Sequence, residues 1–169
     1  MRKIFNIAGI VALLLLGVCI YRILFPNDEK RIRQLLAEAA ETAAVKPEEN
    51  PLLKIAGASK LVGFFSPDAV LKMDVAGVDT RTLDDPDDLR QAITAARASL
   101  QEAKFQLHQV QVNVGPDSRS ATAQLVAMAY LNNSGDPLVQ ELKMQLKKID
   151  RHWKISQVET VKTLGMRSG

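Results

Sequence analysis

The feature that most constrains this chain is an uncharged segment near its start. From Ile4 to Tyr21, eighteen consecutive residues carry no charge, and Asn6 is the one strongly polar residue among them. At about 1.5 Å per residue, a helix of that length spans roughly 27 Å, close to the hydrocarbon thickness of a bilayer. The sequence therefore predicts a transmembrane signal-anchor helix within residues 1–26. The remainder, residues 27–169, reads as one soluble domain with its core at about residues 28–164.

Two alternatives to an uncleaved anchor share this layout of a basic start and an apolar run. A secretory signal peptide ends at small residues, and residues 18–25 contain no Ala-x-Ala pattern. Lipidation at Cys19 would need a small residue directly before it, where this chain has Val18. We therefore favour the anchor over cleavage and over lipidation.

The orientation of the anchor is set by competing charges. Arg2, Lys3 and the amino terminus favour a cytoplasmic N-terminus. The opposite orientation is favoured by Arg22, Lys30, Arg31 and Arg33 on the other side of the segment. A very short N-terminal tail is usual for a signal anchor, so we expect the domain outside the cytoplasm, in the periplasm if the source is bacterial. The lone cysteine lies in the anchor and does not identify the compartment.

The charge of the soluble part argues against nucleic acid as a partner. All 19 acidic residues follow residue 25, and three of the 22 basic residues precede it, which leaves nineteen of each sign and no net charge. Nucleic-acid binding depends on an excess of basic residues. One basic cluster remains, which we interpret as a solvated face of two strands in preference to a phosphate or lipid-headgroup site. Its members are Lys143, Lys147, Lys148, Arg151 and Lys154.

Three helices are predicted from their start signals and apolar stripes. Asn50 before Pro51, and Asp85 before Pro86, are favoured helix starts because proline fits the first helical position. The first helix, capped by Asn27 or Asp28, carries apolar residues at helical spacing. The predicted helices cover residues 28–46, 51–62 and 86–100.

Strands make up the rest of the predicted domain. A short strand is expected at residues 70–75, and four longer ones at residues 105–114, 120–131, 138–149 and 153–164, joined by short polar turns. In three of the four long strands the apolar alternation shifts by one residue. Such a shift keeps one face apolar if an extra residue bulges out, and we therefore predict bulges near His108, Lys147 and Gln157. Bulges bend a sheet, so the sequence predicts an α+β cone with helices on its concave face.

Two segments carry a resemblance to a known superfamily. Residues 61–68 read LVGFFSPD and residues 148–155 read KIDRHWKI, the second being similar to a K-x-D-G-x-W-x-I hairpin but without its glycine. With three helices followed by a mostly antiparallel bent sheet, the chain resembles the nuclear transport factor 2-like superfamily, which includes SnoaL-like and ketosteroid-isomerase-like proteins. The resemblance implies the cone fold. It leaves the activity open, because this fold supports enzymes, binding modules and assembly parts.

The resemblance also implies where an enzyme of this kind would hold its catalytic groups. Ketosteroid isomerase has a tyrosine on the first helix, and residues 28–45 contain none. Its general base lies in the first strand region, where Asp74 is the candidate, although a solvated turn carboxylate is the favoured interpretation. Its second acid lies on a strand that corresponds here to residues 120–131, which contain no carboxylate. Two of three catalytic parts are therefore missing.

Histidines and aromatic residues give the remaining candidates. His108 lies at a predicted bulge, which would turn it into the interior as a proton-transfer group, but a partly exposed strand histidine is the favoured interpretation. His152, in a turn, is expected to be solvated. The sequence has no metal-ligand spacing, so we predict neither a metal nor a cofactor. Tyr130 completes the weak catalytic candidates. The expected pocket-lining residues are Phe65, His108, Met128, Tyr130 and Trp153.

Two hypotheses follow. The first is a non-catalytic binding or assembly module held at a membrane. The superfamily that the chain resembles includes membrane-tethered scaffolds of type IV secretion assemblies. Such a module would bind a small apolar ligand or form a homodimer through its sheet. The second is a small-molecule isomerase, dehydratase or cyclase with a rewired site. They differ in whether Asp74, His108 and Tyr130 converge inside the cone.

Overall fold

The computed structural model describes residues 27–73, 81–132 and 135–164. The predicted anchor at residues 1–26 lies outside this part of the chain, as does Asp74. Within the described ranges, no helix is both long and apolar enough to cross a bilayer. The described elements begin at Asp28 and end at Leu164.

The three described helices begin at the residues that the sequence predicts. They are α2 (Asp28–Ala43), α3 (Pro51–Val62) and α4 (Pro86–Ser99). Each cap side chain accepts a backbone N–H of the first turn, at 3.0 Å for Asn27, 2.9 Å for Asn50 and 2.7 Å for Asp85. These bonds satisfy amide groups that the helix itself leaves unpaired. Asn27 rather than Asp28 is therefore the cap of α2, and Asp28 is free for another role.

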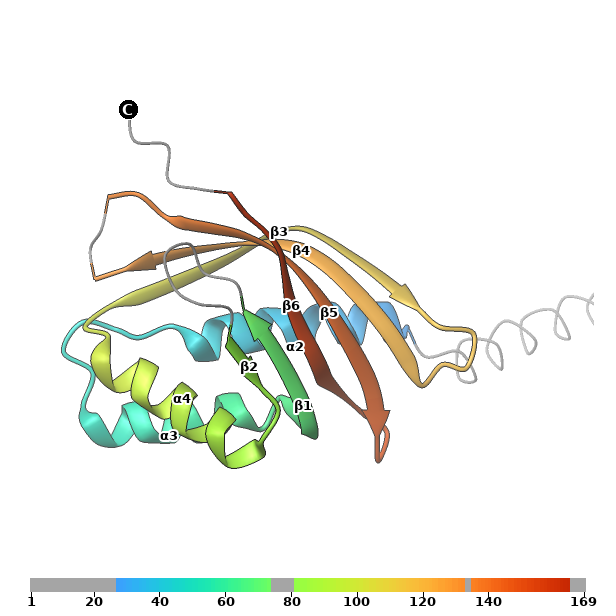
Figure 1. Cartoon of the computed structure of the whole chain (residues 1–169), viewed down its shortest axis with the longest axis horizontal. Helices are drawn as coiled ribbons and strands as arrows, with labels where there is room; N and C mark the ends of the chain where they lie inside the picture. Colours follow the sequence, from blue (N-terminus) through green and yellow to red (C-terminus); the bar gives the residue numbers. More distant parts are fainter. Residues whose placement is uncertain (1–26, 74–80, 133–134, 165–169) are drawn as a thin grey trace, which may run out of the picture.

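The sheet has six strands in the order β2-β1-β6-β5-β4-β3. Figure 1 shows it arching over α2, with α3 and α4 on the same side. We call the face toward the helices the inner face and the opposite one the outer face. All neighbouring strands are antiparallel except β1 and β6, which are parallel. The strands are β1 (Phe65–Met73), β2 (Arg81–Leu83), β3 (Ala103–Val114), β4 (Ser120–Leu131), β5 (Leu138–Ile149) and β6 (His152–Leu164).

Bulges in β3 and β6 account for the bend of the sheet. In β3 the extra residue lies between His108 and Gln111, where Gln109 has a φ of 52°. In β6 one extra residue lies between Ile155 and Gln157, and a second bulge follows at Val161. The predictions of bulges near His108 and near Gln157 are thus confirmed, and each bulge bends its strand.

The predicted bulge near Lys147 is wrong. The pairing of β4 with β5 runs without interruption from Ser120 opposite Lys147 to Ala129 opposite Leu138. The apparent shift arose because Lys148, a charged residue, occupies an inner position opposite Trp153. A charged side chain in that place hides the alternation on which the prediction relied.

The first strand region also differs from its prediction. β1 begins at Phe65, five residues before the predicted start, and the short strand β2 was not predicted. Pro67 and Asp68 indicate a turn in the sequence, but here they lie in an irregular stretch of β1, where the register with β6 shifts between Phe65 and Val70. Proline is tolerated in a strand where the ladder is already interrupted.

Arg97 joins the three helices at their common end. It is a charged residue of α4, yet only 5% exposed. Its Nη1 donates to the backbone carbonyls of Thr42, Ala43 and Ala44 at 2.5, 2.9 and 3.1 Å, where α2 ends without a basic residue of its own. The cation therefore stabilises the negative end of the α2 dipole.

The same guanidinium reaches α3. Its Nε donates to the Lys54 carbonyl at 3.2 Å, and its Nη2 pairs with the Glu49 carboxylate at 3.1 Å. Gly57 leaves the space for this arrangement, since a Cβ there would lie 2.4 Å from Nη2 of Arg97. The packing of α3 on α4 thus requires both the arginine and the glycine.

We expect Arg97→Ala to lower the free energy of unfolding by about 3 kcal/mol, because it leaves Glu49 and several helix-end carbonyls buried without partners. Urea denaturation followed by circular dichroism measures the change. Arg90→Ala on the same helix is the matched control, since its side chain is 66% exposed, and it should change stability by less than about 0.5 kcal/mol. Equal effects of the two substitutions would contradict this account of Arg97.

Candidate functional site

Three of the expected pocket residues lie on the outer face of the sheet. Leu107 of β3 is opposite Ala127 of β4, and both pack on the inner core. The next pair along the ladder, His108 opposite Val126, therefore points outward, and the side chain of His108 is exposed. By the same alternation Met128 and Tyr130 also lie on the outer face, partly buried. The bulge in β3 follows His108 and does not turn it inward.

The two other expected pocket residues lie on the inner side. Phe65 packs against the core cluster, and Trp153 belongs to it with 4% exposure. His152 is exposed at the start of β6, and its Nδ1 lies 2.8 Å from the carbonyl oxygen of Asp150. Asp74 lies outside the described residues. The weak catalytic candidates that are described, His108 and Tyr130, thus share the outer face and do not meet in the interior.

The interior holds a different polar group, the carboxylate of Asp28. It accepts from Nε1 of Trp153 at 3.0 Å and from Nζ of Lys148 at 2.7 Å. Nζ of Lys148 also lies 4.8 Å from the centre of the Trp153 ring, which is a cation–π distance. Asp28 is only 7% exposed. One buried carboxylate therefore joins the start of α2 to β5 and β6.

Burial raises the pKa of the Asp28 carboxyl, but the hydrogen bonds from Lys148 and Trp153 outweigh it. Together with the positive charges of Lys148 and Arg31, they hold that pKa below its usual value of 3.8. A carboxylate stabilised in this way is a weak base at neutral pH. The group therefore suits a structural role better than proton abstraction.

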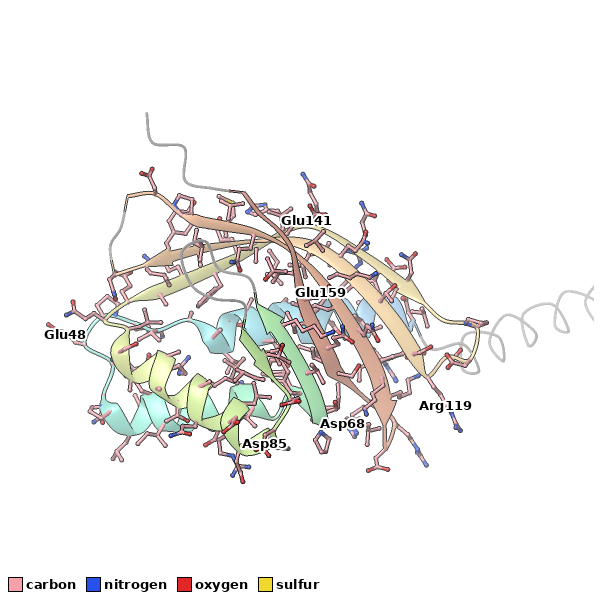
Figure 2. All side chains as sticks on the ribbon, viewed as in Figure 1. Glu48, Asp68, Asp85, Arg119, Glu141 and Glu159 are labelled. Carbon is pink, nitrogen blue, oxygen red and sulfur yellow. The ribbon has the colours of Figure 1, made fainter. Side chains whose placement is uncertain are left out.

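Most of the predicted basic cluster has partners within the protein. Lys147 pairs with Asp68, which is labelled in Figure 2. Lys148 pairs with Asp28, and Lys154 donates to the carbonyl of Gly63. These three lysines tie the β5–β6 hairpin to β1, α2 and the end of α3. Of the five basic residues in the cluster, Lys143 and Arg151 are exposed and form no hydrogen bond or ion pair within the described part of the chain.

An apolar groove of about 470 Å³ runs between α2 and β3, and we call it the edge groove because β3 is the last strand of the sheet. Small alanine side chains on α2 leave its space open. At one end Nη1 of Arg33 donates to the Val110 carbonyl at 2.5 Å, next to the bulge. Its lining residues are Arg33, Leu36, Ala37, Ala40, Glu41, Ala44, Lys104, Phe105, Leu107 and Val110.

A second concave site of about 710 Å³ lies between α2 and the β5–β6 turn, and we call it the hairpin hollow. Its apolar part is formed by Leu35, Phe64 and Trp153, and its rim carries both signs of charge. The charged and polar lining residues are Arg31, Gln34, Glu38, Asp150, Arg151 and His152. Among the described residues no group of His, Cys, Asp and Glu side chains has the arrangement of a metal site.

Sequence reasoning missed Asp28, Arg97 and Arg31 as site or core residues. Asp28 was considered only as a helix cap. Arg97 follows Leu89 and Ile93 at a spacing of four, and it is buried on the same stripe of α4. That spacing is the one signal that could have found Arg97, because a charged residue on a buried helical stripe requires partners.

Comparison with known proteins identifies the fold. No protein-family model matches the chain, and no curated protein matches it. A candidate scytalone dehydratase of Novosphingobium aromaticivorans matches with a TM-score of 0.64 at 11% identity, over 84% of this chain and 89% of that one. An NTF2-like protein with a cystatin-like fold from the same bacterium matches at 0.65 with 17% identity, over 89% and 90%.

A third solved structure is an NTF2-like protein of unknown function from Pseudomonas putida, with a TM-score of 0.63 at 12% identity, over 85% of this chain and 92% of that one. At such identities the likeness shows the fold and nothing further. The chain therefore has the cystatin-like, nuclear transport factor 2-like α+β fold that the two sequence segments indicated.

The Asp28 contact predicts a defined dependence of stability on pH. Its pKa is lower in the folded than in the unfolded chain, so the unfolded chain takes up the proton first as the pH falls. The stabilisation is complete above the unfolded pKa of about 3.9 and disappears as the pH falls through the folded pKa. Asp28→Asn should therefore cost about 2 to 3 kcal/mol at pH 7 and less at pH 2.5.

Urea denaturation at the two pH values measures this difference. Glu41→Gln is a suitable control, because Glu41 is exposed on the same helix. A stability loss in Asp28→Asn that is equal at pH 7 and pH 2.5 would show that the ionised carboxylate is not what stabilises the contact.

Proposed function

We propose that this chain is a non-catalytic binding or assembly module, held at a membrane by its apolar segment at residues 4–21. The observation that carries the proposal is the outward position of His108 and Tyr130. General acid–base catalysis needs a proton-transfer group within hydrogen-bond reach of an enclosed substrate. Neither side chain faces the interior.

The buried carboxylate supports the same proposal. Asp28 is the carboxylate that lies deepest in the described part of the fold, and both of its oxygens accept hydrogen bonds. A base that is already satisfied by Lys148 and Trp153, with a lowered pKa, gains little by taking a proton from a substrate. The alternative, an isomerase, dehydratase or cyclase, draws on a similar structure named as a candidate scytalone dehydratase and on Asp74.

The outer face of the sheet is the surface we assign to a partner, a second copy of this chain. Met128 of β4 lies directly opposite Val139 of β5, and Val126 and Tyr130 flank this pair on the same face, all of them partly exposed. Apolar side chains at neighbouring outer positions of a sheet favour burial against another surface. For a small apolar ligand, we propose the edge groove as the binding site, because its lining is apolar.

The membrane part of the proposal gives a direct prediction. We expect the intact chain to sediment with membranes and to stay there after sodium carbonate extraction, because eighteen uncharged residues favour an inserted helix. Immunoblotting of the pellet and the supernatant measures this. Release by carbonate, or a mature protein that starts after residue 18 in the soluble fraction, would contradict the anchor.

The binding part predicts which substitutions matter. Met128→Glu should shift the detergent-solubilised chain from dimer to monomer in analytical ultracentrifugation, because it places a charge in the proposed interface. Gln124→Glu, at an exposed position on the same face of the same strand, is the matched control and should remain dimeric. Asp74→Ala, which removes the catalytic candidate of the enzyme alternative, should complement a deletion strain as the wild type does, and Met128→Glu should not.

Two outcomes would contradict this assignment. If Asp74→Ala stays folded and membrane-bound yet behaves like the deletion, the enzyme alternative is favoured. If the wild-type chain is monomeric, the outer face is not an interface between copies.

A further inference from the structure

Two arginine side chains line the hairpin hollow without a hydrogen bond or ion pair in the described part of the chain. Arg31 belongs to the first turns of α2, and Arg151 to the β5–β6 turn. The Asp28 carboxylate, whose pKa Arg31 helps to lower, already accepts hydrogen bonds from Lys148 and Trp153. Both guanidinium groups are therefore available to an external anion. Guanidinium groups bind phosphate oxygens in a planar, often bidentate, geometry.

The backbone holds Arg151 in a conformation that disfavours an arginine. Asp150 and Arg151 form a two-residue hairpin loop with φ values of 48° and 66°. This type of turn favours asparagine, aspartate or glycine, and an arginine held at a positive φ costs about 1 to 3 kcal/mol. The side chain of Arg151, held at this position, is exposed at the rim of the hollow.

The other charges of the hollow define the ligand further. Glu38 and Asp150 line it together with the two arginines, so its rim offers acceptors for a cation as well as donors for an anion. Leu35, Phe64 and Trp153 supply an apolar wall. A ligand that complements all three features carries a phosphate, an ammonium group and an apolar part, as a phosphoethanolamine lipid does.

The chain connection places this hollow near a membrane, and this step rests on the proposed anchor. Six residues, 22–27, separate the end of the uncharged segment from Asp28. Even fully extended they span at most about 20 Å. Arg31 lies within one helical turn of Asp28. Lipid headgroups are therefore within reach of the hollow.

We propose that the hairpin hollow binds the headgroup of a phosphoethanolamine lipid, with its phosphate between Arg31 and Arg151 and its ammonium group facing Glu38 and Asp150. The hollow would orient the domain on the membrane surface that the anchor provides.

The test uses the full chain in dodecyl maltoside micelles. Trp153, the single tryptophan of the chain, lines the hollow and reports binding by fluorescence. The probes are dihexanoyl phosphatidylethanolamine, dihexanoyl phosphatidylglycerol and inorganic phosphate. We expect a saturable change with the ethanolamine lipid, and a Kd at least about tenfold weaker for the Arg31→Gln/Arg151→Gln double variant. Glu38→Gln should weaken the binding of the ethanolamine lipid and leave the binding of the glycerol lipid unchanged.

Arg90→Gln is the matched control, because it removes the same charge from an exposed position on α4 and should bind as the wild type does. If the double variant fails to fold by circular dichroism, the two single variants replace it. Equal titration by both lipids and by inorganic phosphate, a change that does not saturate, or an unchanged Kd in the arginine variants would overturn the proposal.

The experiment separates this inference from the proposed function. Carbonate extraction tests the anchor, and the micelle titration does not need the anchor to be inserted in a bilayer. A chain that resists extraction but shows no preference for the ethanolamine lipid would overturn the headgroup site and leave the membrane-held module in place.

Discussion

The carboxylate of Asp28 fixes the start of the first helix against the last hairpin of the sheet. Its oxygens accept from Trp153 at 3.0 Å and Lys148 at 2.7 Å, so one residue of α2 is bonded to both strands of the last hairpin. Breaking a buried pair of this kind leaves a charge without compensation, which costs several kcal/mol. With Asn27 as the cap, Asp28 is free to turn inward.

Arg97 holds the opposite end of the same helix. A buried cation on α4 receives its compensation from the last carbonyls of α2, from α3 and from Glu49. The two buried charges therefore fix α2 at both ends, and its apolar residues Ile32 and Leu36 fill the space over the sheet. Beside them, the edge groove stays open between α2 and β3 on the inner face.

The sequence predicted the helix starts, two bulges and the bounds of β4 and β5, because these depend on local signals such as caps, proline and alternation. It failed where a polar residue takes part in a long-range contact. In the sequence Lys148 interrupts the apolar alternation, but in the structure it is an inner residue opposite Trp153. Pro67 is typical of a turn, but it lies in strand β1. For the candidate site, sequence could place His108 beside a bulge but not decide which face it joins, since one residue of register reverses the face.

The location of Asp28 also has a mechanical consequence for a membrane-held protein. It is the first residue of α2, so any force that an anchor transmits through residues 22–27 reaches the domain at this point. A helix end held only by its own hydrogen bonds would fray under such a load, because terminal turns are the least stable part of a helix. The bonds from Lys148 and Trp153 pass the load directly to β5 and β6. If the proposed anchor is present, the hairpin that carries Arg151 is thus fixed relative to it through Asp28.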